Sequence, residues 1–269
     1  MTDYTSNDIA ERMKAAERLA REAGRLALDY FNRRDELVIE EKKSAQDLVS
    51  EADKEVELLI RRGVRQAFPS DALLGEEHGL EGDTDGFVWV IDPIDGTSPF
   101  LIGMPMWAVS IAVAHGGEPI VGAVYLPALD EMYVAGEGLG ATLNGRPLSI
   151  QRGHTLASRM SCVDSSIGSD PEKAAEAIRN ILDAGGSYVR LASAAVELVY
   201  VASNRLVAAY LAVARSWDCF GGLCIVKEAG GRVMPYRTRD GTLSGPATVV
   251  ATAPQVYDDF LALMPVVPK

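Results

Sequence analysis

The carboxylates best placed for chemistry in this 269-residue chain lie in the motif DPIDGT at 92–97, directly after the apolar segment 87–91. Pro93 fixes its own φ and favours an extended Asp92, and Gly96 permits a turn that other residues resist. Asp92 and Asp95 can then converge on one point, with the Ile94 carbonyl as a further oxygen ligand. Hard cations such as Mg²⁺ prefer such ligands. Taken alone, the motif is equally compatible with an Asx-rich turn whose side chains cap backbone amides.

Three further polar clusters lie at predicted ends of elements, where loops hold functional groups on a rigid scaffold. They are Gly75-Glu76-Glu77-His78, Trp217-Asp218, and the segment 42–47, which ends at Asp47. Each has an ordinary explanation when it is taken alone. The first reads as a solvated loop, the second as an N-cap aspartate and the third as a surface turn.

Helices and short strands must position these clusters. Apolar residues spaced by three and four predict a helix over 8–33, and a capping box from Ser50 to Asp53 opens another that stops before Pro69. Short buried strands are predicted at 87–91, 107–114 and 120–126, and Asn144-Gly145 predicts a type I′ hairpin turn.

The second half of the chain alternates helices and strands more regularly. The predicted helices are 170–184, capped by Asp170, then 194–202, and a third that opens at Asp218 and closes at Gly230; the predicted strands are 188–191, 206–211, 232–234 and 247–251. We expect an α/β fold in which residues 1–269 form a single catalytic unit. Two tightly joined subdomains, approximately 1–150 and 151–269, make it up.

Composition excludes several classes of function. The net charge of −12, from 26 basic and 38 acidic residues, argues against a nucleic-acid binder or an anionic-membrane binder. Three histidines and three cysteines form no paired motif, so neither a zinc site nor a disulfide framework is supported. The first 20 residues lack the pattern of a signal peptide, and no apolar run of about 18 residues occurs. We therefore expect a cytoplasmic protein.

In this order and at these separations, GEE at 75–77, DPIDGT at 92–97 and WD at 217–218 resemble the inositol monophosphatase family of Mg²⁺-dependent, lithium-sensitive phosphatases. The resemblance extends to DLVSEAD at 47–53 and EAGG at 228–231, and it covers nearly the whole chain. It implies a layered αβαβα sandwich, a homodimer, and a hydrolase. The implied reaction is the hydrolysis of a small-molecule phosphate monoester by metal-activated water.

The resemblance also implies roles for individual residues. Glu76, Asp92 and the Ile94 carbonyl would hold a first metal ion, and Asp92, Asp95 and Asp218 a second. A third, loosely bound Mg²⁺ would lean on Glu76, which gives two to three ions per site, with Mn²⁺ as an alternative. Without metal, such clustered carboxylates would repel one another and raise each other's pKa values.

Further implied roles concern the water and the substrate. Asp47 and Thr97 would orient the attacking water, so that Asp47, Thr97 and Glu76 form the catalytic set. The residues expected to contact the substrate are Asp95, Gly96, Thr97, Ser193, Ala194, Leu211 and Arg215. For Arg215, a surface arginine is an equally good interpretation.

Three positions depart from the family pattern. Pro99 stands where an asparagine is usual, which changes loop hydrogen bonding and removes no proposed ligand. Phe220 stands where a small residue is usual, so a large ring must find space and can reshape the pocket wall. Leu211, six positions before Trp217, stands where inositol-specific members have an acidic residue that binds ring hydroxyls.

Leucine cannot pair with a hydroxyl, so the sequence predicts a substrate other than myo-inositol 1-phosphate. Histidinol phosphate, a sugar phosphate or a nucleotide 2′- or 3′-phosphate remain open. A function of another class is a non-catalytic interaction protein on the same fold, since some relatives bind partners in gene expression. The intact acidic positions favour the enzyme.

Overall fold

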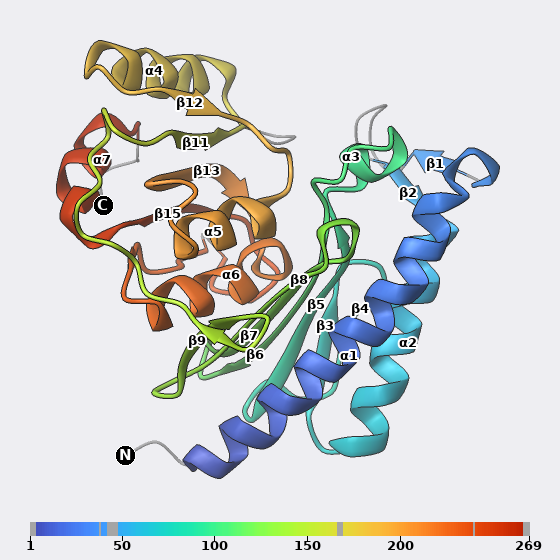
Figure 1. Cartoon of the computed structure of the whole chain (residues 1–269). Coiled ribbons are helices and arrows are strands. Elements are labelled where there is room, and N and C mark those ends of the chain that lie inside the picture. Colours follow the sequence, from blue (N-terminus) through green and yellow to red (C-terminus); the bar gives the residue numbers. More distant parts are fainter. Residues whose placement is uncertain (1–3, 38, 42–47, 166–168, 239, 266–269) are drawn as a thin grey trace.

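Five layers of helices and sheets build the molecule. The computed structural model describes residues 4–37, 39–41, 48–165, 169–238 and 240–265. Helices α1 (Ser6–Asn32) and α2 (Glu51–Ala67) cover one face of an eight-stranded sheet, and α5 (Ala194–Ala202) and α6 (Ser216–Glu228) cover the other. A five-stranded sheet follows, with α4 (Pro171–Asp183) and α7 (Tyr257–Leu263) outside it (Figure 1). This arrangement confirms the predicted αβαβα sandwich.

The large sheet has the strand order β10-β9-β8-β7-β6-β5-β3-β4. Its strands are β3 (Ala72–Gly75), β4 (Gly79–Glu81), β5 (Phe87–Asp95), β6 (Ala108–His115), β7 (Glu118–Leu126), β8 (Glu131–Gly136), β9 (Gly140–Leu143) and β10 (Arg146–Pro147). Neighbouring strands run antiparallel, except that β3 and β5 are parallel. The carboxyl ends of β3 and β5 therefore meet at the same edge.

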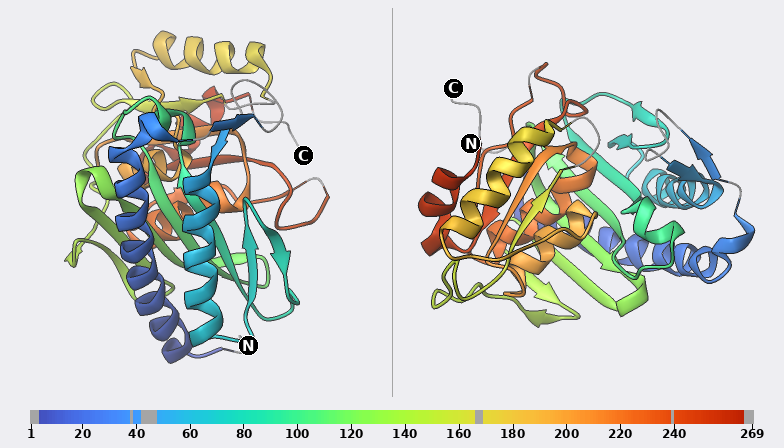
Figure 2. Two further views of the ribbon diagram at one scale, coloured as in Figure 1. Left: turned by 90° about the vertical axis from the view of Figure 1, so that its right-hand side faces the viewer. Right: turned by 90° about the horizontal axis from the view of Figure 1, so that it is seen from above.

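The two faces of this sheet belong to two different cores. Along β5, Val88 and Val90 pack with α5, α6 and the small sheet, whereas Trp89 and Ile91 pack with α1 and α2. This alternation follows from the two-residue repeat of a strand, and both faces are apolar because both are covered. Figure 2 shows α1 and α2 side by side on their face of the sheet.

The small sheet has the order β12-β11-β13-β15-β14. Its strands are β11 (Ser161–Asp164), β12 (Tyr188–Val189), β13 (Ala208–Ala214), β14 (Arg232–Val233) and β15 (Ala247–Thr252). A separate hairpin pairs β1 (Ile39–Glu41) with β2 (Leu48–Ser50), and α3 (Thr97–Leu101) is a short helix after β5. Short 3₁₀ turns lie at Arg34–Glu36, Pro127–Leu129 and Pro254–Val256.

Local signals in the sequence predicted several boundaries. The Ser50–Asp53 capping box is confirmed: the Ser50 N–H donates to Asp53 Oδ2 over 2.8 Å. Asp170 caps α4 through the Glu172 N–H, with Pro171 in the first helical position. Asn144 and Gly145 have φ values of 49° and 74°, as a type I′ turn requires.

Two of the boundaries predicted at the acidic motifs were wrong. The strand predicted to end at Ile91 continues through Asp95, because Asp92 and Asp95 stay paired with β6 on either side of a bulge. Asp218 does not open its helix, since α6 begins two residues earlier and Asp218 is its third residue.

In the part of the chain that the structure describes, no helix is long and apolar enough to cross a membrane.

Candidate metal centre

The parallel pair β3 and β5 brings the first two acidic motifs together. Gly75 at the end of β3 lies opposite Ile91 of β5, so Glu76 and Asp92 follow at the same edge. The Glu76 N–H donates to the Ile91 carbonyl over 3.1 Å, which continues the pairing by one residue. Residues 16 positions apart in the sequence thus become neighbours through strand register.

Helix α6 supplies the third carboxylate, Asp218. This helix packs closely on the large sheet because glycines face each other. A Cβ on Gly122 would lie 2.3 Å from the carbonyl oxygen of Gly221. At the start of the helix, Ser110 Oγ donates to the Trp217 carbonyl over 3.2 Å. Asp218 is therefore fixed at the edge where β5 ends.

Carboxylate oxygens of Glu76, Asp92 and Asp218 lie within 4.8 Å of one another. Asp92 is buried, and Glu76 and Asp218 are half-buried. Burial, followed by the charge of Glu76, raises the pKa values of Asp92 and Asp218 well above the usual range. A partly buried group of oxygen ligands that repel one another is suited to a hard divalent cation, which removes the repulsion and replaces lost hydration. The donor set therefore fits Mg²⁺.

Asp95 is buried beside this group and is oriented toward α5. Its Oδ2 accepts hydrogen bonds from Ser193 Oγ and from the Ala195 N–H, the latter over 2.8 Å. Burial raises the pKa of Asp95 to about 7, although these two donors oppose the shift. Its charge in turn contributes to the raised pKa values of Asp92 and Asp218. Asp95 thus lies close to the three-carboxylate cluster without being one of its three members.

Residues 94–97 form a tightly bonded turn next to the cluster. Asp92 Oδ1 accepts the Ile94 N–H over 3.0 Å. The Thr97 hydroxyl lies 3.2 Å from the Ile94 carbonyl and 3.4 Å from Asp53 Oδ1. Gly96 has φ +91°, and a Cβ there would meet the Met106 carbonyl at 2.9 Å. Only glycine therefore permits the turn that follows Asp95.

The remaining predicted substrate residues differ in their surroundings. Ser193 caps α5 and Ala194 is the first residue of that helix. Leu211 lies in β13 and is only 1% exposed. The Arg215 Nη1 donates to the Ser244 carbonyl over 2.6 Å, and its guanidinium lies 5.4 Å from the Trp217 ring. The structure thus brings Ser193 to Asp95, and it gives Arg215 contacts within the protein.

The other predicted positions are placed as follows. Asp47 and the rest of the segment 42–47 lie outside the described residues. Pro99 is buried in α3, where its carbonyl accepts the Met104 N–H. The Phe220 ring is fully buried and meets Tyr236 edge-on, with ring centroids 4.9 Å apart. The Phe220 ring is therefore accommodated within the hydrophobic core.

Sequence reasoning missed two buried glutamates next to the site, Glu57 in α2 and Glu197 in α5. Each accepts two consecutive backbone N–H groups of a neighbouring turn. Glu197 had a visible signal, because it is the one charge in the otherwise apolar helix 194–202. Glu57 had none, since acidic residues surround it in the sequence.

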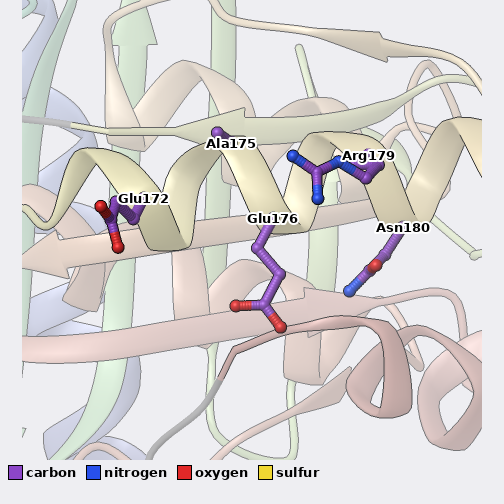
Figure 3. A pocket seen from close by; sticks show the side chains of 5 residues that line it. All are labelled: Glu172, Ala175, Glu176, Arg179 and Asn180. Atoms are coloured by element: carbon purple, nitrogen blue, oxygen red, sulfur yellow. The ribbon is translucent and has the colours of Figure 1, made fainter.

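A surface pocket away from this centre lies along helix α4. Its lining residues are Glu172, Ala175, Glu176, Arg179 and Asn180 (Figure 3). None of the predicted site residues lines it, and Asn180 is bound to the Leu263 carbonyl. The acidic edge of the large sheet, which we define by Glu76, Asp92 and Asp218, is therefore the candidate site, and this pocket is not part of it.

Comparisons with known proteins identify the family of the chain. A family model described as the inositol monophosphatase family matches residues 8–264. A histidinol-phosphatase from Chlorobaculum parvum is 36% identical over 240 residues, which cover 89% of this chain and 91% of that protein. A Nus factor SuhB from Xylella fastidiosa is 35% identical over 225 residues, 82% of this chain and 80% of that protein. Among solved structures, an IMPase from Thermotoga maritima has a TM-score of 0.82 at 29% identity, over 94% of this chain and 96% of that chain.

Proposed function

The chain belongs to the inositol monophosphatase family, and from this premise we propose that it hydrolyses a small-molecule phosphate monoester with Mg²⁺ held by its acidic edge. The observation that carries this proposal is the cluster of Glu76, Asp92 and Asp218, whose oxygens lie within 4.8 Å of one another. A phosphatase of this family needs a site that attracts an anionic phosphate, and bare carboxylates would repel it. The cluster therefore requires bound cations to work.

The chain's own residues would hold and orient the reacting groups. Glu76, Asp92 and Asp218, with the Ile94 carbonyl and Asp95, are the proposed ligands of two to three Mg²⁺ ions, or of Mn²⁺ in their place. When bound, these ions supply positive charge that lowers the pKa of the attacking water and stabilises the leaving oxygen. Thr97, together with Asp47, is proposed to orient that water. The tight turn at Gly96 would leave backbone amides to face the phosphate.

The identity of the substrate follows less directly. The relative described as a histidinol-phosphatase makes histidinol phosphate the first candidate. Sugar phosphates and nucleotide 3′(2′)-phosphates are the alternatives on the same site. Leu211 offers no acceptor for a polyol hydroxyl, which supports a substrate other than myo-inositol 1-phosphate. Ser193 and Ala194, next to Asp95, are the proposed contacts on the leaving group, with Arg215 as a further one.

Several finer properties complete the proposal. We take residues 1–269 as one catalytic unit, since buried side chains from both predicted subdomains share the core around α5 and α6. A cytoplasmic location is supported by three cysteines that are free and buried. Homodimer formation and inhibition by Li⁺ follow from family membership, and sedimentation and a Li⁺ titration of the activity would test them.

Phosphate release from a substrate panel tests the function. The panel holds histidinol phosphate, inositol 1-phosphate, fructose 1,6-bisphosphate and 3′-phosphoadenosine 5′-phosphate, each with Mg²⁺ and with EDTA. We expect Mg²⁺-dependent turnover of at least one substrate and its loss in Asp92→Asn. The absence of turnover for all of them, with wild type and variant alike, would refute the proposal.

The name of the Nus factor relative supports a second candidate, a non-catalytic interaction protein. This candidate predicts a partner that is captured from lysate equally well by wild type and by Asp92→Asn. The complete acidic cluster favours the enzyme.

A further inference from the structure

The turn that carries Glu76 is held by a buried carboxylate from another element. Glu57 of α2 is fully buried. Its Oε2 accepts the Glu77 N–H over 2.8 Å, and its Oε1 accepts the His78 N–H over 3.2 Å. These are the two backbone amides that directly follow Glu76. The conformation of the turn therefore depends on the position of the Glu57 carboxylate.

Arg61, one helical turn after Glu57, completes this support. Its Nε donates to Glu57 Oε1 over 2.7 Å, and its Nη2 donates to the Gly79 carbonyl over 2.5 Å. The guanidinium thus compensates the buried charge of Glu57 and binds the far end of the same turn. Together the two side chains hold the turn at three successive residues, from 77 to 79.

Glu76 is also fixed from the opposite side. Its N–H donates to the carbonyl of Ile91, the residue before Asp92. Gly75 precedes it, and a Cβ at Gly75 would lie 2.1 Å from Glu57 Oε1. The carboxylate therefore occupies the space in which a side chain at position 75 would stand. Glu76 is confined between this carboxylate and the end of β5.

We propose that Glu57 is a positioning residue of the metal centre, which holds Glu76 in place through the backbone of the turn 76–79. The inference rests on the proposed function only in taking Glu76 as a metal ligand. A buried ion pair such as Glu57–Arg61 adds little to the free energy of unfolding, because the cost of desolvating both charges offsets most of their attraction. What the pair adds is a fixed geometry, and residues that orient metal ligands in this way typically change metal affinity by about 10- to 100-fold.

Glu57→Gln tests this role with little change of volume. Both oxygens of Glu57 accept hydrogen bonds, so a glutamine must place its NH₂ group against donors: either the Glu77 N–H, or the Arg61 Nε–H and the His78 backbone N–H. The turn then loses at least one of its anchors. Glu55→Gln is the matched control, because Glu55 lies on the same helix, is exposed and faces Tyr30.

Mg²⁺ affinity is the decisive measurement, taken by isothermal titration calorimetry on the whole chain without substrate. We expect Glu57→Gln to bind Mg²⁺ about tenfold more weakly or worse, and Glu55→Gln to match wild type. The half-saturating Mg²⁺ concentration for phosphate release should rise by the same factor, while kcat at saturating Mg²⁺ stays within about threefold. A folded Glu57→Gln whose Mg²⁺ affinity lies within twofold of wild type would overturn the proposal.

Gly75→Ala displaces the same carboxylate from the other side, and it serves if Glu57→Gln does not fold. The added methyl group must push the Glu57 side chain away from the turn, so the same loss of Mg²⁺ affinity is expected. An unchanged affinity in Gly75→Ala would contradict the role as well. Calorimetry separates the two proposals: wild type that binds Mg²⁺ but releases no phosphate refutes the function alone, whereas wild type that binds no Mg²⁺ refutes the metal centre and, with it, the role of Glu57.

Discussion

Glu197 should make the stability of this protein fall as the pH rises. Its carboxyl group is fully buried in α5, and Oε1 accepts the N–H groups of Leu191 and Ala192 over 2.8 Å and 3.1 Å. Within the described part of the chain, Oε2 has no hydrogen-bond partner. Burial, followed by the charge of Asp164, raises the pKa of Glu197 from 4.5 to about 8.

The size of the effect follows from this shift. A raised pKa in the folded state means that the folded protein holds a proton which the unfolded chain has already lost. The stabilising contribution is therefore complete below about pH 4.5, declines as the pH rises, and is lost by about pH 8. Integrated from about pH 5.5 to about pH 8, the loss amounts to about 3 kcal/mol for this one group.

Urea unfolding in EDTA, at several pH values between these limits, measures this contribution in wild type and in Glu197→Gln. Glutamine keeps an oxygen for the two amides and places its NH₂ group where Oε2 has no partner, so the fold should persist. We expect the free energy of unfolding of the variant to exceed that of wild type by about 3 kcal/mol more at pH 8 than at pH 5.5. The exposed control Glu176→Gln should follow wild type throughout. Parallel profiles of wild type and Glu197→Gln would refute the assignment of a protonated Glu197.

Three further predictions concern the neighbourhood of the metal centre. Ser193→Ala removes both the cap of α5 and a hydrogen bond to Asp95, and it should lower the free energy of urea unfolding by about 1–3 kcal/mol; a change below about 0.5 kcal/mol would contradict this. Gly122→Ala forces a methyl group against the backbone of α6 and should cost about 1–3 kcal/mol and lower phosphatase activity, whereas Gly153→Ala, which has nothing within 4 Å, should affect neither. Mg²⁺ at about 100 times its dissociation constant should stabilise wild type by about 2.7 kcal/mol in thermal unfolding, and Asp92→Asn should lose most of that gain. Equal stabilisation of wild type and Asp92→Asn by Mg²⁺ would place the bound ion elsewhere.

What the sequence predicted correctly is mostly local. The box from Ser50 to Asp53, the cap at Asp170 and the Asn144-Gly145 turn each depend on residues within three positions of one another. Such signals are readable because the same few residues both form and satisfy the structure. The αβαβα architecture came instead from the order and spacing of the acidic motifs, through the family they resemble.

The interior of the site was less accessible to sequence reasoning, because it depends on register and on backbone groups. Glu76 and Asp92 meet because β3 and β5 pair in parallel, and β3 itself had not been predicted. Glu57 and Glu197 bind main-chain amides, which every sequence contains and which no motif marks. Leu211 was singled out by its position before Trp217, yet its burial depends on packing within the small sheet.

Glu57 and Glu197 show how one residue type can serve two different purposes at the same site. Both are fully buried, and both accept two consecutive amides of a turn beside the acidic cluster. Glu57 has a guanidinium at 2.7 Å, so its turn is held by a compensated charge. Glu197 has a neighbouring carboxylate instead, and its pKa is accordingly raised. The turn that leads to Ser193 and Asp95 should therefore loosen as the pH rises.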